Sequence, residues 1–535
     1  MLSKKNLLAL LPLFLIVFLA SVLRLWQLGS VPISMSDDEI RLVYSGYSIA
    51  HTGRDAFGNF LPLVFKMDGA STYGQVPIYL SGIFFLFLKL NTFTARLPFA
   101  LSGILSVVTL YFILKKILNN DKIALLASFS LSVSVWSLQM TRFAIEIDVA
   151  VLMYLVGILL FLYAKKRTSV FLLSMIFFFL GFYTYAAVKI ILIPILIILT
   201  WYNFKLLTKK HFFIILATIV VAFGSFWFLS VAKGGTSYSA VNGSFFFFQD
   251  KATTSQAVEL ERRASQEPNL IKTLYHNKFT YWLRVASTSY LTTFSPQYLF
   301  LNQEANGIYS IWGRGELYLF ELPLCLLGAF YLFLKKRKEF LLILGLLLIS
   351  PLPSALGIGN PTWTSRAGFT LFWLCTFVGA GIYYLVTIFK KRNYRYLIFA
   401  VIAIFYLYAV VGYLSQYYFD WSRTNAKYFS KSTQDLVCKI NVYQAQNKAV
   451  VVSGATVNTF MHYAFYNQLD PKLVQENINK IPIKFANITF YDGCLAQIPT
   501  DVTYISSANC KYKQKPTSQI KEYDSPEIVW DIYEK

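Results

Sequence analysis

The sequence predicts an α-helical polytopic membrane protein that carries a small extracytoplasmic α/β domain at its C-terminal end. Three observations support this fold class. Of the 535 residues 56% are hydrophobic, and the mean hydropathy is positive. The apolar residues gather in runs of roughly 17 to 25 residues, the length needed to cross a bilayer as a helix. Beyond residue 415 the hydropathy falls and the residue pattern becomes that of a water-facing domain.

Eleven apolar runs are predicted to be membrane-spanning helices, and ten of them lie downstream of residue 95. Their approximate bounds are 7–26, 96–114, 122–140, 148–164, 168–186, 188–203, 211–232, 317–334, 340–357, 365–388 and 396–414. The first run has a basic start, as a cleaved signal peptide also would. Because its apolar stretch is about 20 residues long, an uncleaved first span is favoured.

Clusters of Lys and Arg between the runs predict the orientation, because cytoplasmic loops carry an excess of these residues. Six clusters fall in every second gap, so all six are placed in the cytoplasm together with the N-terminus. Because the number of spans is odd, the C-terminal region then lies outside the cytoplasm. The expected location is a bacterial or archaeal plasma membrane. The clusters are Lys4-Lys5, Lys115-Lys116 with Lys122, Lys165-Lys166-Arg167, Lys205 with Lys209-Lys210, 335–338, and Lys390-Lys391-Arg392 with Arg395.

The same topology gives two large outer loops, at about 29–95 and 233–316. One further apolar run, 77–88, is short, and counting it as a span would move every later basic cluster to the outside. We therefore expect an interfacial or re-entrant helix there. The chain divides into a transmembrane domain, 1–415, and an extracytoplasmic domain, 416–535.

In the second domain, helices are predicted at 425–446 and 457–466. Strand-like runs are predicted at 449–453, 485–491 and 502–505, so a small α/β fold is expected. Cys494 and Cys510 lie in this region. If it is extracytoplasmic a disulfide between them is permitted, although their spacing alone does not establish it.

A net charge of +22 would ordinarily suggest nucleic acid as a partner. Much of the excess lies in short loops at helix ends, where it sets topology and contacts anionic lipid headgroups. The expected partner of these charges is therefore the bilayer, and no nucleic-acid partner is predicted.

Acidic residues gather on the outer side, where ionisable groups beside a membrane are functional candidates. Ser36-Asp37-Asp38-Glu39 follows the first span by a few residues. A helix N-cap with an acidic first turn explains one or two of the three acids.

A second outer cluster spans 141–148. Arg142 and Glu146 are four residues apart, so a helical salt bridge is the simplest interpretation. Asp148 opens the next span, where the helix dipole favours an acid. Each acid has a structural explanation, but together they converge on one face of the membrane.

Outer-side cations are Lys189, Arg314 and Arg366. A lone Arg at a helix end is usually a headgroup anchor. Several cations beside an acidic cluster also suit an anionic phosphate bound next to a base.

Several motifs together resemble the protein mannosyltransferase and aminoarabinose transferase superfamily. The resemblance covers about residues 1–415 and leaves the C-terminal domain uncovered. It rests on the order of individually weak motifs: Asp38-Glu39, 52–58, Pro77-Ile78-Tyr79, Arg96-Leu97-Pro98, 142–148, 182–185, Phe294-Ser295-Pro296 with Phe300-Leu301, and 350–353 with Arg366. The resemblance implies a GT-C fold and a glycosyltransferase that uses polyprenyl-phosphate-linked sugars.

The implied reaction needs a base for the acceptor's proton and cations for the leaving phosphate. Asp38, which matches the family's first-loop aspartate, is the predicted base, and a single displacement would invert the anomeric centre. Arg366 is the best placed of the three cations. The residues predicted to bind substrate are Asp37, Glu39, Arg142, Glu146, Asp148, Tyr183, Tyr185, Lys189, Arg314 and Arg366.

No cofactor is certain. Some members of the superfamily carry an acidic residue or His before the first-loop proline, whereas this chain has Gln75-Val76-Pro77. A divalent metal stays possible through the oxygens of Glu39, Glu146 and Asp148. Four His in the whole chain give no zinc-like constellation.

The predicted function is transfer of a sugar from a polyprenyl-phosphate donor to a protein, lipid or polysaccharide acceptor on the outer face. A polymerase or ligase of lipid-linked glycans would share the same features. A flippase is a non-enzymatic alternative, but transporters tend to repeat halves and place charges at the midplane. This chain has no internal repeat, and Glu321 is the only acid well inside a late span.

Overall fold

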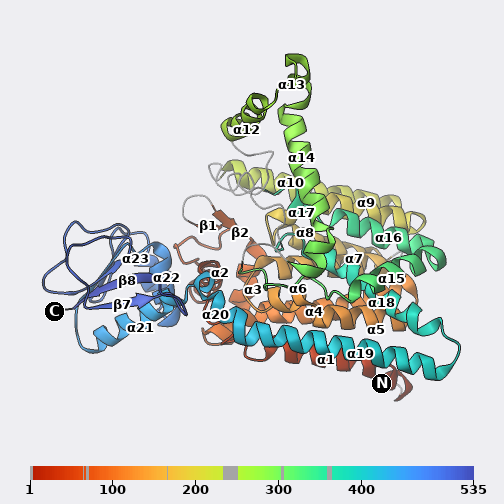
Figure 1. The fold of residues 1–535 in the computed structure, drawn as a ribbon, viewed down its shortest axis with the longest axis horizontal. Coiled ribbons are helices and arrows are strands. Elements are labelled where there is room, and N and C mark those ends of the chain that lie inside the picture. Colours follow the sequence, from red (N-terminus) through yellow and green to blue (C-terminus); the bar gives the residue numbers. More distant parts are fainter. Residues whose placement is uncertain are drawn as a thin grey trace.

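The computed structural model describes residues 4–63, 65–67, 71–164, 167–232, 251–302, 307–357 and 364–534. The chain forms a bundle of long helices with a separate sheet domain at one end (Figure 1). The predicted fold class, a helical membrane protein with a small C-terminal α/β domain, is confirmed.

Each predicted span contains a helix. The helices are α1 (Lys4–Leu25), α4 (Thr92–Leu118), α5 (Asp121–Val133), α7 (Glu146–Ala164), α8 (Thr168–Phe182), α9 (Leu192–Asn203), α10 (Lys209–Ala232), α15 (Glu321–Lys335), α16 (Arg337–Ile349), α18 (Gly368–Thr387) and α19 (Arg392–Ser415). Among the described residues, seven helical segments are long and apolar enough to cross a membrane. The number of spans therefore stays a prediction.

Three spans are less regular than predicted. Ser134 has an extended backbone between α5 and α6 (Val135–Met140), where its hydroxyl accepts a hydrogen bond from the Ser137 amide and starts the new helix. A 3₁₀ turn, η1 (Ala187–Ile191), precedes α9. α16 ends at Ile349 before Pro351, and only the short α17 (Leu352–Ala355) follows, because proline cannot continue a helix interior.

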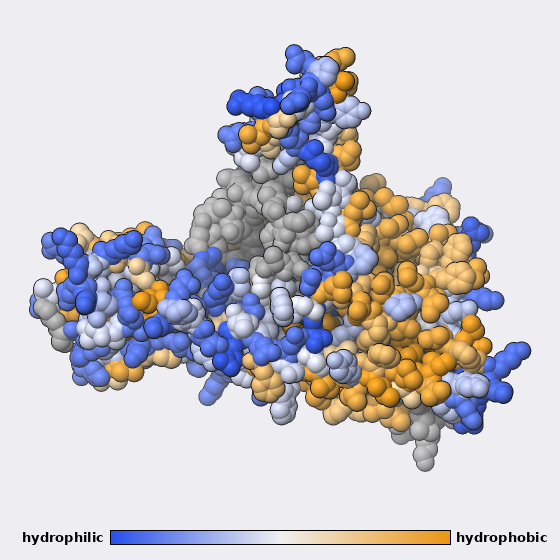
Figure 2. Space-filling view, in the orientation of Figure 1, coloured by the Kyte–Doolittle hydropathy of each residue, from blue (hydrophilic) through white to orange (hydrophobic). Residues whose placement is uncertain are grey.

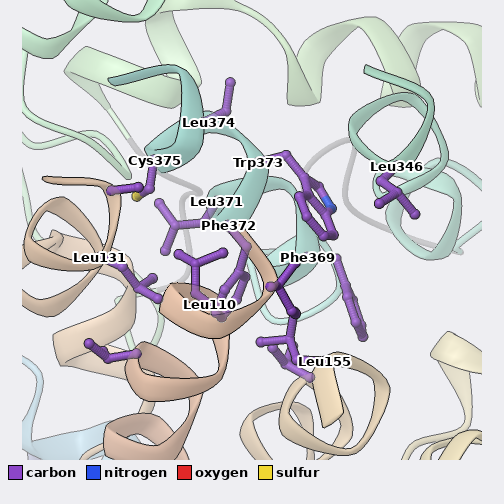
Figure 3. Close-up of a cluster of buried hydrophobic side chains, with 14 of the residues drawn as sticks. Leu110, Leu131, Leu155, Leu346, Phe369, Leu371, Phe372, Trp373, Leu374 and Cys375 are labelled. Atoms are coloured by element: carbon purple, nitrogen blue, oxygen red, sulfur yellow. The ribbon is translucent and has the colours of Figure 1, made fainter. Parts of the chain in front are cut away.

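α18 forms the centre of the bundle. Figure 3 shows Phe369 and the side chains from Leu371 to Cys375 of this helix among Leu110 of α4, Leu131 of α5, Leu155 of α7 and Leu346 of α16. α15 crosses α18 at two glycines, where a Cβ on Gly328 would lie 1.8 Å from the Phe377 carbonyl oxygen and one on Gly381 1.8 Å from that of Leu324. Small residues allow this close approach of helices in a membrane.

The surface supports the predicted insertion. Figure 2 shows an apolar surface over the helices, with hydrophilic side chains at the rim away from the sheet domain. The N-terminus lies at that rim, and the sheet domain lies at the opposite end (Figure 1). Lys165 and Lys166 of the third basic cluster lie outside the described residues.

The first outer loop contains α2 (Asp37–Thr52) and α3 (Gln75–Phe85), together with the hairpin of β1 (Phe65–Met67) and β2 (Ser71–Tyr73). These elements lie at the end of the bundle that faces the sheet domain (Figure 1). α3, at 11 residues, is too short to span a bilayer. It packs closely on α2, where a Cβ on Gly46 would lie 2.6 Å from the Ile78 carbonyl oxygen.

The described stretch 251–302 of the second outer loop is mostly helical. It comprises α12 (Lys251–Ala264), α13 (Asn269–Tyr275), α14 (Lys278–Thr293) and the π-helical turn η4 (Gln297–Leu301). α14 extends away from the bundle and carries α12 and α13 at its far end (Figure 1).

The C-terminal domain follows the turn η5 (Gln416–Trp421) and two short turns, α20 (Ser422–Thr424) and η6 (Ala426–Phe429). Its helices are α21 (Lys431–Ala445), α22 (Val457–Tyr466) and α23 (Pro471–Asn477). The strands are β3 (Val450–Ser453), β4 (Ile483–Phe485), β5 (Ile488–Tyr491), β6 (Thr503–Ser507), β7 (Ser518–Lys521) and β8 (Ile528–Tyr533). The sequence did not predict α23, β7 or β8.

The strand order is β4-β5-β3-β6-β8-β7, and β3 pairs in parallel with both β5 and β6. Cys494 and Cys510 form a disulfide with a Cα–Cα distance of 5.4 Å. This bond joins the segment after β5 to the segment after β6.

Candidate functional site

Three consecutive acids start α2 and point in three directions. Ser36 caps the helix, because its hydroxyl accepts from the Glu39 amide while the Glu39 carboxylate accepts from the Ser36 amide. Residues in a helix are about 100° apart around the axis, since 3.6 residues complete a turn. Asp37, Asp38 and Glu39 therefore have different neighbours.

Glu39 is buried and holds the first loop to the bundle. Arg96 donates from Nε to its Oε1 at 2.9 Å and from Nη2 to its Oε2 at 3.2 Å, and the Ala144 amide donates to Oε1 at 2.9 Å. Arg96 also donates to carbonyl groups of Leu28, Pro32 and Ser34. Both oxygens of Glu39 are thus used in structural contacts.

Asp37 faces the C-terminal domain. Its Oδ1 lies 2.8 Å from His462 Nε2 and accepts from the Ser430 hydroxyl at 2.8 Å, while its Oδ2 accepts from Asn458 at 2.8 Å. Arg41, one helical turn further along α2, donates to the Oδ1 of Asn458. The residue before the predicted base therefore connects the two domains.

Asp38 is exposed, so an acceptor from solvent can reach it. Its carboxylate lies within electrostatic range of Glu146, which is the first residue of α7. The two acidic clusters of the sequence therefore meet at the end of the bundle.

Glu146 joins three segments. Its Oε1 accepts from the Gly74 amide at 3.0 Å, and its charge is within electrostatic range of Lys189. Gly74 touches the chain after α8 closely, because a Cβ there would lie 1.5 Å from the Thr184 carbonyl oxygen. The next amide, that of Gln75, donates to the Tyr183 carbonyl at 3.1 Å.

Lys189 lies over aromatic rings at the junction of η1, α8 and α10. Its Nζ is 5.3 Å from the ring centre of Phe182, 5.9 Å from that of Tyr183 and 5.5 Å from that of Phe226. Cation–π contacts of this kind hold an ammonium group without neutralising it. The Tyr183 hydroxyl lies 2.6 Å from that of Ser225 in α10.

Tyr185 connects Arg366 to the surroundings of Glu146. The Tyr185 hydroxyl is hydrogen-bonded to Arg366 and to Ser365, and it lies within electrostatic range of Glu146. Arg366 itself is 9% exposed. Asp38, Glu146, Tyr185, Lys189 and Arg366 are therefore brought together, and we refer to them as the Glu146 cluster.

Three other predicted site residues lie elsewhere. Arg142 is buried and donates to the carbonyl groups of Leu23, Arg24, Trp26 and Val31 at the end of α1. Arg314 donates to Gln416 beyond α19. Asp148 is buried near Arg24, and among the described residues no hydrogen-bond partner is found for either of its oxygens. Arg142 and Arg314 therefore have structural partners, whereas Asp148 lies beside Arg24 and apart from the Glu146 cluster.

The three acids suggested as metal ligands are separated. Glu39 is bound by Arg96, Glu146 by the Gly74 amide, and Asp148 lies beside Arg24. In the described part of the chain, no three His, Cys, Asp or Glu residues are grouped as a metal site would need.

Glu321 has a structural environment. Its Oε1 accepts from the Ser130 hydroxyl at 2.8 Å and from the Tyr406 hydroxyl at 2.6 Å, while Oε2 accepts from the Tyr318 amide at 2.9 Å. A buried carboxyl group satisfied in this way is a fixed part of the bundle.

Sequence reasoning missed Gly74, Arg41, Asn458 and His462. Gly74 stands directly before Gln75-Val76-Pro77, where an acidic residue or His would have been the signal. The other three residues join segments more than 400 positions apart, and no local sequence pattern predicts such a contact.

Comparison with known families agrees with the motifs. Residues 75–228 match the family described as Dolichyl-phosphate-mannose-protein mannosyltransferase. That segment contains Glu146, Tyr185 and Lys189 of the Glu146 cluster. No curated protein sequence matches the chain.

Among solved structures, the chain resembles ArnT from Cupriavidus metallidurans bound to undecaprenyl phosphate, with a TM-score of 0.51 and 10% identity over 98% of both chains. It also aligns with the oligosaccharyltransferase AglB from Archaeoglobus fulgidus in complex with an inhibitory peptide and a dolichol-phosphate, with a TM-score of 0.49 and 12% identity over 95% of this chain and 70% of that one.

The apo form of the Archaeoglobus fulgidus oligosaccharyltransferase aligns with a TM-score of 0.47 and 12% identity over 85% of this chain, which spans 63% of that protein's length. At these identities the likeness to ArnT shows the fold alone, and this is the GT-C fold. The family match and the fold together confirm the superfamily resemblance that the sequence motifs predicted. The family match, over residues 75–228, is to mannosyltransferases, and the likeness to ArnT adds the fold.

Proposed function

We propose that this protein is an inverting glycosyltransferase that moves a sugar from a polyprenyl-phosphate donor to an acceptor on the extracytoplasmic face. The observation that carries the proposal is the Glu146 cluster, in which an exposed carboxylate and two cations meet at the end of the bundle away from the basic loops. ArnT and AglB, which the chain resembles, were solved with undecaprenyl phosphate and dolichol-phosphate respectively.

In the proposed reaction Asp38 takes the proton of the acceptor hydroxyl while the acceptor oxygen attacks the anomeric carbon. The bond from that carbon to the phosphate oxygen breaks, and polyprenyl phosphate leaves with the electron pair. Because the acceptor attacks from the side opposite the leaving group, one displacement inverts the anomeric configuration. A carboxylate within hydrogen-bond reach of a hydroxyl can act as such a base.

Arg366 and Lys189 are proposed to stabilise the charge that develops on the phosphate. Guanidinium groups bind phosphate oxygens with two parallel hydrogen bonds, whereas an ammonium acts as a point charge. Tyr185 holds Arg366 by a hydrogen bond, and Glu146 keeps Lys189 nearby by charge attraction. Preorganised charges of this kind contribute most where water is excluded.

The orientation with the N-terminus in the cytoplasm and the C-terminal domain outside is part of the proposal. A disulfide in the C-terminal domain supports it, because such bonds persist in oxidising compartments.

The test incubates purified protein in nanodiscs with labelled polyprenyl-phosphate sugars and candidate acceptors. We expect transfer by the wild type, and a loss of at least 100-fold in Asp38→Asn, since a general base contributes about 10²–10⁴-fold. Arg366→Met should lose far more turnover than Arg314→Met. The matched control is Asp121→Asn, because Asp121 is exposed at the opposite end of the bundle.

Nuclear magnetic resonance of the product should show an inverted anomeric centre. A retained configuration would contradict the single displacement. Equal turnover by Asp38→Asn and the wild type would remove Asp38 as the base.

A further inference from the structure

A groove lies between the C-terminal domain and the first outer loop, apart from the Glu146 cluster. Its volume is about 710 Å³, within the range of small-ligand sites of roughly 300–1,000 Å³. We call it the interdomain groove. Its lining comprises Phe57, Asn59, Ala455, Thr456, Val457, Asn458, Ile478, Asn479, Lys480, Ile481, Pro482, Ile483, Phe490 and Asp492.

The floor of the interdomain groove lies at the carboxyl ends of two parallel strands. The lining residues 455–458 follow β3, and Asp492 follows β5. β3 and β5 pair in parallel, so the loops that follow their carboxyl ends lie side by side. In open α/β sheets, ligands bind outside the carboxyl ends of the strands, where such loops leave room.

The opposite wall comes from the transmembrane domain and is held firmly. The Oδ1 of Asp55 accepts from the amides of Phe57 at 3.0 Å and Asn59 at 2.8 Å. The Asn479 side chain donates to the Phe57 carbonyl at 3.3 Å, and Gln475 donates to the Asp55 carbonyl at 3.1 Å. Because both domains build the walls, the site requires the whole chain.

One lining residue connects the groove to the proposed base. Asn458 donates to Asp37 Oδ2 at 2.8 Å and accepts from Arg41. Asp37 directly precedes Asp38 in α2. Asn458 therefore links the lining of the interdomain groove to the residue that precedes the proposed base in α2.

The lining is close to neutral, which distinguishes it from the Glu146 cluster. Lys480 and Asp492 are its one cation and one anion, and Thr456 and Asn479 add exposed polar groups. Ile481, 85% exposed, adds an apolar surface. Hydroxyl-rich ligands with apolar C–H faces match such a lining, whereas a phosphate would call for several cations.

We propose that the interdomain groove binds the neutral carbohydrate portion of the acceptor, a hydroxyl-rich oligosaccharide. This inference rests on the proposed glycosyl transfer. Under this proposal the C-terminal domain helps to recognise the acceptor, while the Glu146 cluster binds the donor phosphate.

The test uses full-length protein in nanodiscs and a panel of neutral di-, tri- and tetrasaccharides, with neutral peptides of similar mass as the comparison. Calorimetry should show saturable binding of at least one saccharide to the wild type. Thr456→Trp, which places an indole in the groove, should weaken that binding at least tenfold. Thr456 is exposed and its hydroxyl makes no cap hydrogen bond, so the fold should tolerate the change. Glu476→Trp, on an exposed position of α23 outside the lining, is the matched control.

Binding and turnover separate this inference from the proposed reaction. Asp38→Asn should bind the saccharide like the wild type but fail to transfer sugar to it. Thr456→Trp should raise KM for the saccharide acceptor with kcat little changed. The inference is overturned if no saccharide binds, if Thr456→Trp binds as well as the control, or if the groove takes peptides instead.

Discussion

His462 Nε2 lies 2.8 Å from Asp37 Oδ1, so a buried histidine of the C-terminal domain contacts the residue next to the proposed base. Asn458 and Ser430 bind the same carboxylate. The position of Asp38 thus depends on a domain that the superfamily resemblance does not cover.

The contact of Asp37 should weaken in acid. Burial raises the pKa of Asp37, but the hydrogen bond and charge of His462, with the hydrogen bond of Ser430, lower it to about 2 from an ordinary 3.8. A carboxyl group with a lowered pKa stabilises the fold above its unfolded pKa and loses this effect as the pH falls through the folded value. The melting temperatures of the wild type and of Asp37→Asn should therefore differ most above about pH 4. The difference should shrink as the pH falls toward 2. A difference that stays constant over this interval would contradict the assignment.

Gly74 should tolerate no side chain. A Cβ there would lie 1.5 Å from the Thr184 carbonyl oxygen, so Gly74→Ala must displace a backbone whose amides donate to Glu146 and Tyr183. We expect a loss of about 1–3 kcal/mol in unfolding free energy, the usual range for a disruptive substitution, together with reduced transfer. The control is Gly224→Ala, since nothing lies within 4 Å of a Cβ at that position in α10. Equal melting temperatures for the two variants would show that the segment adapts.

Tyr185 is expected to act by holding Arg366. Tyr185→Phe removes the hydroxyl that is hydrogen-bonded to Arg366 and Ser365 but keeps the ring. A hydrogen bond to a charged group contributes about 1.5–3 kcal/mol, so transfer should fall at least tenfold. The control is Tyr290→Phe, because Tyr290 lies in α14 and its hydroxyl donates an exposed hydrogen bond to the Leu348 carbonyl. Losing that bond should leave transfer unchanged. Steady-state kinetics with varied donor would check this, and unchanged donor kinetics in Tyr185→Phe would exclude the role.

The helices could be predicted because apolar length and basic clusters are local signals, and α4, α7, α18 and α19 lie close to their expected bounds. Irregular places such as Ser134 were missed, because an extended residue between two apolar helices leaves the hydropathy unchanged. In the C-terminal domain β3 and α22 matched their patterns, whereas β7 and β8 are mixed in polarity and were missed.

Five of the predicted site residues lie together in the Glu146 cluster, but their arrangement could not be predicted, and the other predicted site residues lie elsewhere. The sequence places Glu146, Lys189 and Arg366 on one side of the membrane, the family resemblance singles out Asp38 on the same side, and the fold brings the four together. Which acid of the trio is accessible depends on helix rotation and on partners far along the chain. Arg96, for example, is 57 positions from Glu39.

Substitutions at Glu39 can separate a structural role of this residue from the substrate-binding role that the sequence predicts. Its ion pair with Arg96 is buried, with side chains 1% and 0% exposed. Removing one partner of such a pair costs about 3–5 kcal/mol, because the other charge stays buried without compensation. Glu39→Gln and Arg96→Met should each lower the unfolding free energy by about this amount, and the double variant should lose less than the sum. Lys115→Met, which breaks an exposed pair with Asp121, should cost at most about 1 kcal/mol. Chemical denaturation in detergent measures these values. If Glu39→Gln unfolds like the wild type yet no longer transfers sugar, Glu39 contacts the substrate and the structural role assigned to it here is wrong.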